Sequence, residues 1–257
     1  MNMFFKMSIG TLLLAGAAST AIAGPEHKHV TESREVDART VRVKVEGVIS
    51  LKVRQGDVAR LVITGDPRWV AKTVALQKGD SLYIDTEMRS GNVVSHKSVS
   101  AELTLPQLRE VVSESLGSTD IRGFSGSDLH LALDGAGSMK VVCNYRNVNA
   151  KLGGLGSLNI EGGDSENVDV DLHGAGYVTL AGTAKTLKAS LGGLGGLDAR
   201  RFESRNVDLD MSGLGNAVVH ARDQANLNLS GMGSVTVFGK PAGRKVSVDG
   251  LGNVNWK

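Results

Sequence analysis

The chain of 257 residues contains 33 glycines, only 4 prolines and 4% aromatic residues. High glycine without proline argues against a collagen-like or disordered chain, and together with abundant valine and leucine it favours many short strands joined by tight turns. The 29 Lys and Arg are interspersed with 27 Asp and Glu for a net charge of +2, so the sequence shows no basic footprint for nucleic acid or an anionic membrane.

The first 23 residues are expected to be a signal peptide. Lys6 supplies the positive charge, residues 9–18 form a short apolar run, and Ala21-Ile22-Ala23 is a small-x-small cleavage site. No later segment approaches the roughly 20 apolar residues that a membrane-spanning helix needs. We therefore expect an exported protein without a membrane span, located in the periplasm, on the cell surface or outside the cell. Residues 24–34 are expected to be a flexible mature N-terminus.

Residues 35–110 are expected to form short strands of irregular spacing. Five segments alternate apolar and polar residues, and turn signals at 55–57 (QGD) and 78–80 (KGD) lie between them. We expect this section to cap the repeats that follow, because an uncovered end would expose unpaired strand edges. The five segments are residues 41–45, 51–53, 61–63, 82–84 and 101–105.

Residues 111–257 consist of one repeat of 19–20 residues. A Gly-x-Gly unit, with Ala, Leu or Met as x, recurs along this region, and a degenerate copy, Ser115-Leu116-Gly117, precedes the first unit. One repeat cannot bury an apolar face alone, so neighbouring copies must stack to supply the core. The units begin at Gly135, Gly154, Gly174, Gly193, Gly213, Gly231 and Gly250.

Alignment of the copies predicts a strand on each side of the glycine corner. Positions two and four before the first glycine are apolar in every copy and the position between them is mostly polar, which is typical of a strand with one buried face. Positions four and six after the glycine are again apolar, and a polar loop such as residues 182–185 is expected to complete the repeat. The column two before the corner is Leu133, Leu152, Leu172, Leu191, Met211, Leu229 and Val248.

Parallel coils and an antiparallel meander both fit this spacing. A parallel register places Lys188 between Asp169 and Asp208 of the neighbouring coils, and opposite charges on adjacent strands are mildly stabilising. We therefore predict an all-β fold, a right-handed parallel β-helix of about seven to eight coils of 19–20 residues, with a less regular β section before it.

The chain resembles the putative auto-transporter adhesin family with a head GIN domain, found in exported bacterial proteins. The resemblance lies in the Gly-x-Gly coils and in residues 45–48 (VEGV), 103–108 (LTLPQL), 235–241 (VTVFGKP) and 248–254 (VDGLGNV), and covers roughly residues 35–257. It implies an all-β solenoid and an envelope or surface role, with adhesion suggested by the family's name. It brings no catalytic residues.

Outward carboxylates are the one candidate for catalysis. Asp169 and Asp171 share a face with Asp208 and Asp210, which lie two coils away, about 9–10 Å by coil spacing. That separation is near the range of inverting glycosidases. Lys188 lies between the outer pair, however, and a solvated charge ladder is the simpler interpretation.

The remaining polar residues predict no site. The histidines fall in different columns or outside the repeats, whereas a metal site needs three or four convergent ligands. Cys143, the only cysteine, is interpreted as a small buried apolar residue. We assign no catalytic, cofactor-binding or metal-ligating residue. The histidines are His27, His29, His96, His130, His173 and His220.

The sequence thus predicts a non-enzymatic exported envelope protein whose rigid solenoid presents a binding or adhesion surface to a protein or glycan. Two alternatives stay open: a carbohydrate-active enzyme using the outward carboxylates, and an envelope scaffold that assembles as a homo-oligomer through an uncovered solenoid end.

Overall fold

The computed structural model describes residues 29–86 and 99–257, so the predicted signal peptide lies outside the described part. Seventeen strands and one short helix make up this part, and the strands form a single hydrogen-bonded system. Residues 30–34, within the segment predicted to be flexible, belong to the first strand. The elements are β1 (Val30–Glu35), β2 (Arg42–Gly47), β3 (Ile49–Gln55), β4 (Arg60–Gly65), α1 (Pro67–Val70), β5 (Thr73–Lys78), β6 (Ser81–Thr86), β7 (Val99–Leu105), β8 (Glu110–Ser115), β9 (Ser118–Leu133), β10 (Ser138–Leu152), β11 (Ser157–Leu172), β12 (Tyr177–Leu191), β13 (Leu194–Met211), β14 (Leu214–Leu229), β15 (Ser234–Phe238), β16 (Gly243–Val248) and β17 (Asn253–Trp256).

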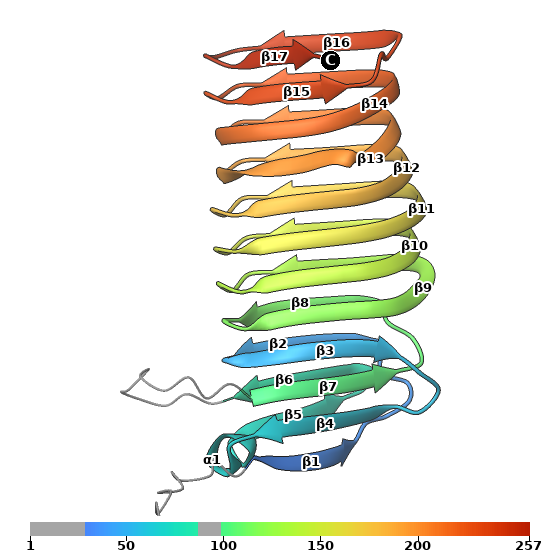
Figure 1. Cartoon of the computed structure of the whole chain (residues 1–257), viewed down its shortest axis with the longest axis vertical. Helices are drawn as coiled ribbons and strands as arrows, with labels where there is room; N and C mark the ends of the chain where they lie inside the picture. The colour runs from blue at the N-terminus through green and yellow to red at the C-terminus, as the bar shows by residue number, and fades with distance from the viewer. Residues whose placement is uncertain (1–28, 87–98) are drawn as a thin grey trace, which may run out of the picture.

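The repeats form the predicted right-handed parallel β-helix, with about seven turns (Figure 1). Each strand from β9 to β14 runs across one face, bends, and returns along the other face to the next glycine corner. Consecutive strands pair in parallel along most of their length. The result is a flattened rod with a glycine edge on one side and a bend edge on the other.

The apolar columns predicted from the repeat are stacked inside this rod. Leu152 pairs with Leu172 and Leu172 with Leu191, and all three side chains are buried. The outward column is also in the predicted register, since Lys188 pairs with Asp169 on one neighbouring coil and Asp208 on the other. A parallel register, rather than a meander, is therefore confirmed.

The corner glycines are required for close approach between coils. A Cβ on Gly154 would collide with the carbonyl oxygen of Gly135, and a Cβ on Gly156 would collide with that of Gly137. The backbone φ of both residues lies outside the left-handed region. A recurrent corner can need glycine for a left-handed backbone angle or for close approach of another chain segment. At Gly154 and Gly156 the reason is close approach, because there is no room for a side chain.

The expectation of a polar loop at residues 182–185 is wrong. This segment lies within β12, where Thr183 pairs with Asp164 and Glu203, and Ala184 is buried. The ladder shifts register just before it, and Gly182 has a φ of 127°. A bulge therefore bends the strand without ending it, because an extra residue on one strand sharpens its local bend.

The section before the repeats continues the same solenoid, but out of chain order. The coil made by β2 and β3 lies between the coil of β6 and β7 and the coil of β8 and β9 (Figure 1). One hydrophobic core runs through both regions, from Val43 to Val237.

The N-terminal end of the rod is built from antiparallel elements. Strand β1 pairs with β4, β4 with β7, and β5 with β6, and Val70 of α1 is buried in the core. The segments predicted at 41–45, 51–53, 61–63, 82–84 and 101–105 lie in β2, β3, β4, β6 and β7, and the turn signal at 78–80 is the β5–β6 hairpin, with Gly79 at φ 62°. Strands β1, β5 and β8 were not predicted.

Among the described residues, no antiparallel strand covers the last coil at the C-terminal end. The last coil consists of β16 and β17, and its inward-column residues Val246 and Val248 are 42% and 44% exposed. Trp256 is partly buried against the core, and the Arg244 guanidinium lies 4.5 Å from the centre of its ring. None of the helices in the described residues is long and apolar enough to cross a membrane.

Candidate functional site: the glycine edge

The outward carboxylates form a ladder of neutralised or hydrogen-bonded groups. Lys188 lies between Asp169 and Asp208 in register, and Asn226 donates from Nδ2 to Asp208 Oδ1 at 3.2 Å. One position along, the Asn228 amide donates to Asp210 at the same distance. Each of the four acids thus has a Lys or Asn in register on a neighbouring coil, the arrangement that stabilises adjacent strands.

The histidines are dispersed as the sequence indicates. His130 lies on the ladder face, His220 near the bend and His173 at a corner, where its Nε2 is 2.7 Å from Asp171 Oδ1. His27 and His96 lie outside the described residues. Within the described ranges, no group of three or more His, Cys, Asp or Glu side chains is placed to hold a metal ion.

Cys143 is buried, as interpreted from the sequence. Burial raises the pKa of its thiol from 9.0 to about 12, so the thiol is neutral at physiological pH. A reactive thiol has a lowered pKa and solvent access, and Cys143 has neither.

The glycine edge carries a row of exposed aliphatic side chains, which we call the aliphatic row. These are the middle residues of the Gly-x-Gly units, one per coil, and the larger ones are between 46% and 81% exposed. Both flanking glycines approach the neighbouring coil, so the middle residue stands at the apex of the corner with its side chain directed away from the core. The row is Leu116, Ala136, Leu155, Ala175, Leu194, Leu214, Met232 and Leu251.

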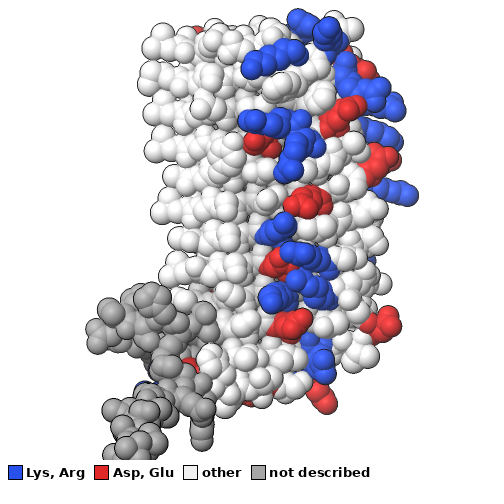
Figure 2. All heavy atoms as spheres, viewed as in Figure 1, with Lys and Arg blue, Asp and Glu red and all other residues white. Residues whose placement is uncertain are grey.

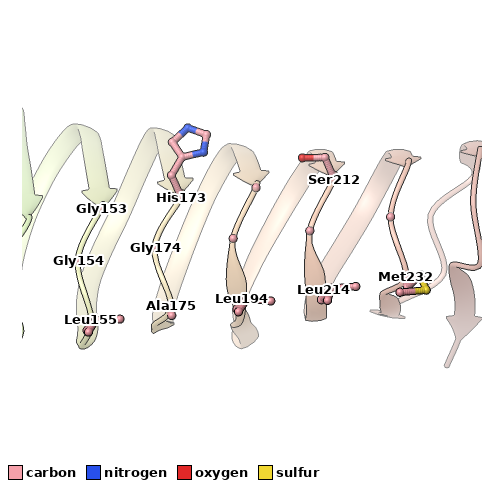
Figure 3. A pocket seen from close by; sticks show the side chains of 14 residues that line it. Gly153, Gly154, Leu155, His173, Gly174, Ala175, Leu194, Ser212, Leu214 and Met232 are labelled. Carbon is pink, nitrogen blue, oxygen red and sulfur yellow. The ribbon is translucent and has the colours of Figure 1, made fainter.

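A shallow groove of about 650 Å³ runs beside the aliphatic row along the rod (Figure 3). Leu155, Leu194 and Leu214 line one side, glycines form the floor, and His173 and Ser212 stand on the opposite side. The floor is flat because a side chain there would collide with the coil beneath. The groove crosses the central coils and is open to solvent.

The glycine edge is also free of charge over the central coils. The corner segments 153–156, 173–176, 192–195, 212–215 and 230–233 contain no Lys, Arg, Asp or Glu. Figure 2 shows the charged side chains gathered toward the bend side of the visible face, with the corner side almost bare of them. A contiguous exposed apolar strip on an uncharged surface is typical of an interaction site.

Tyr177 adds an aromatic side chain to this surface. It follows the corner of its coil, is 46% exposed, and its ring occupies the space that a Cβ on Gly196 would need. The ring is exposed just after the corner and packs over Gly196 of the neighbouring coil, and aromatic residues are enriched at protein interfaces.

Sequence reasoning identified the corner glycines. It missed two features of this surface, namely the residue between the two glycines of each unit and the aromatic Tyr177. The available signal was a residue that stays apolar in every copy although the glycines on both sides direct it outward. Such a position cannot contribute to the core, so its apolar character indicates a contact.

Comparison with known proteins supports this architecture. Residues 41–241 match the model of a family described as putative auto-transporter adhesin, head GIN domain. No curated protein matches. Among solved structures, a putative adhesin from Parabacteroides distasonis has 20% identity and a TM-score of 0.79 over 90% of this chain and 98% of that one. A putative adhesin from Parabacteroides merdae has 19% identity and a TM-score of 0.78 over 90% and 97%. A putative lipid binding protein from Parabacteroides distasonis has 17% identity and a TM-score of 0.74 over 88% and 96%.

Proposed function

Since this chain belongs to the putative auto-transporter adhesin, head GIN domain family, we propose that it is a non-enzymatic protein of the bacterial envelope or surface that binds its partner through the glycine edge. The predicted signal peptide at residues 1–23 supports export. The family's description as an adhesin supports a binding role.

The observation that carries the proposal is the exposed aliphatic row beside an uncharged groove. A folded chain gains free energy by burying apolar side chains, at about 25 cal/mol per Å². Leu155 and Leu194 are nevertheless 62% and 59% exposed in a rod with an ample interior. Covering this strip with a partner recovers that free energy.

The shape of the surface favours binding over catalysis. The groove is open and straight, its floor is glycine, and its only side chains able to transfer a proton or act as a nucleophile are His173 and Ser212, one on each of two coils that are not neighbours. A long flat strip suits an extended contact with a protein, glycan or lipid surface.

Binding of the purified, fluorescently labelled protein to bacterial cells that lack its own gene tests this proposal. We expect the triple variant L155S/L194S/L214S to bind at least about tenfold more weakly, because it removes three apolar side chains from the centre of the row. Its melting temperature should stay close to that of the wild type, since all three side chains are exposed.

The matched control is V58S/V74S, which removes exposed apolar side chains at the N-terminal end, where Val58 and Val74 are 74% and 50% exposed. This control should bind like the wild type. Equal binding by the triple variant would refute a role for the glycine edge, and equal loss in the control would point to general stickiness.

A further inference from the structure

A second hollow region lies where the chain departs from its regular winding. After β7 the chain must pass the coil of β2 and β3 before it begins β8, and residues 106–109 make this crossing. The crossing is fixed on both sides: Gln55 Nε2 donates to the Pro106 carbonyl at 3.1 Å, and Tyr145 Oη donates to the Leu108 carbonyl at 2.7 Å.

Three adjoining hollows of about 320, 340 and 390 Å³ follow this crossing and together make what we call the junction groove. Arg109 and Asp128 line the first two hollows, and Arg42, Glu110 and His130 line the first and third. Because they share these lining residues, the hollows are direct neighbours on the surface. Each is near the lower end of the size range of small-molecule sites.

One side of the junction groove is a register-matched column. Arg42 pairs with Glu110, Glu110 with His130, and His130 with Asn149 on successive coils. Arg42 is neutralised, because its guanidinium lies 3.3 Å from Glu110 and 3.1 Å from Asp80. His130 therefore comes next in the column after the Arg42–Glu110 ion pair, and it lines two of the three hollows.

Two further cations line the groove, and each has an acid nearby: Lys151 pairs in register with Asp171, and the charge of Arg109 helps to lower the pKa of Asp128. Neither Arg109 nor Lys151 forms an ion pair with any of the described carboxylates, and Lys151 lines the hollow next to the one that Arg109 lines. Asp128 lines two of the hollows with Arg109, and its Oδ1 accepts the Asn147 amide at 2.9 Å. Hydrogen bonds from Ser127 and Asn147, with smaller contributions from the charges of His130 and Arg109, hold the pKa of Asp128 below its usual value.

We propose that the junction groove binds a sugar unit that carries a carboxylate or phosphate group. Arg109 and Lys151 line the groove without a close ion pair to a described carboxylate, so their donors can make charge-assisted hydrogen bonds to the anionic group. Glu110, Asn149 and the Asp128 carboxylate offer acceptors and a donor for the hydroxyl groups of the ring. The hollows admit one or two sugar rings and are too small for a folded protein segment.

Isothermal titration calorimetry on the purified protein tests the proposal with three probes: digalacturonic acid, its methyl ester and glucose 1-phosphate. We expect at least one of the two anionic probes to bind and the uncharged ester not to bind. The two anions separate a carboxylate ligand from a phosphate ligand. Failure of both to bind, or equal binding of the ester, would overturn the proposal.

Variants then locate the site. Arg109→Ser and Lys151→Ser should each weaken binding about tenfold, the effect of losing one charge-assisted hydrogen bond. Lys188→Ser is the matched control, since it removes the same charge from the same face at a position between Asp169 and Asp208. An equal loss in Lys188→Ser would show a general charge effect and would refute the site.

The outcome is independent of the glycine edge. The L155S/L194S/L214S variant should bind the anionic probe like the wild type, because its substitutions lie at the corners and not in the junction groove. Circular dichroism of each variant checks that the fold is intact. Loss of cell binding and loss of sugar binding can therefore be told apart.

Discussion

At the corner glycines, a single added methyl group would collide with the backbone of the neighbouring coil. A Cβ on Gly154 would overlap the carbonyl oxygen of Gly135, which is fixed in the parallel ladder. We expect Gly154→Ala to lower the free energy of unfolding by about 1–3 kcal/mol, the usual cost of overpacking. Urea denaturation followed by circular dichroism measures this.

Gly162→Ala is the control for that substitution. Gly162 lies in β11 of the same coil, has a φ outside the left-handed region, and its added Cβ would meet only the Ser165 hydroxyl at 4.0 Å. It should change the free energy of unfolding by less than about 0.5 kcal/mol. If both variants lost equal stability, close approach would not explain the corner glycines.

The buried thiol of Cys143 makes stability depend on pH in the alkaline range. Its pKa is raised from 9.0 to about 12, so the folded protein keeps the thiol proton that the unfolded chain releases. This contribution is fully present below about pH 9 and is lost as the pH rises toward 12. Between pH 8 and pH 10 we expect the wild type to lose about 1 kcal/mol more stability than Cys143→Ala, measured by urea midpoints. Parallel pH profiles would show that the thiol is hydrated in the folded state.

At the scale of strands, the ladder of Asp169, Lys188 and Asp208 tests the register directly. Lys188→Glu places three carboxylates on successive coils, which replaces two attractive cross-strand pairs by two repulsive ones. We expect a loss of about 1 kcal/mol at low salt, with part of it recovered in 1 M NaCl, where charges are screened. Lys188→Gln should lose less and should be insensitive to salt. Melting curves at both salt concentrations measure this, and equal losses in the two variants would contradict the predicted charge effect.

The sequence predicted strands correctly where a regular repeat of apolar residues is visible within a short segment. Leu152, Leu172 and Leu191 could be placed in one column because period-two burial and constant spacing are both visible in the sequence. The bend at residues 182–185 could not, since a bulge and a loop use the same Gly and polar residues. The coil of β2 and β3 lies out of chain order in the rod. This order depends on pairing between strands that are distant in the sequence, which no local sequence pattern indicates.

The candidate sites were predictable to a smaller degree. The sequence identified each Gly-x-Gly corner, but the exposure of the middle residue depends on the close approach of neighbouring coils. The junction groove was not predictable, because it combines Arg42, Arg109, Glu110 and Lys151 from segments that only the threading brings together.

At the scale of the whole rod, the two ends differ in how they protect unpaired strands. Antiparallel strands and α1 occupy the N-terminal end, whereas β16 and β17 leave their outer edges unpaired in the described chain. Arg244 occupies an inward column, where it pairs with the buried Ala225 of the coil below, and its guanidinium stacks on Trp256. An inward-pointing charge at a sheet edge is a known protection against edge-to-edge pairing.

If this charge blocks association, its removal should join rods end to end. The Arg244→Leu variant would have an apolar leucine beside the exposed Val246 and Val248 in the last coil, whose outer strand edge is unpaired. We expect light scattering to show a higher average mass for this variant than for the wild type at the same concentration. Arg201→Leu adds an exposed leucine near the bend, away from the end, and should not change the mass. If the wild type already had the mass of the Arg244→Leu assembly, the last coil would be an assembly surface, as the scaffold alternative requires, and Arg244 would have to be compatible with a neighbouring rod.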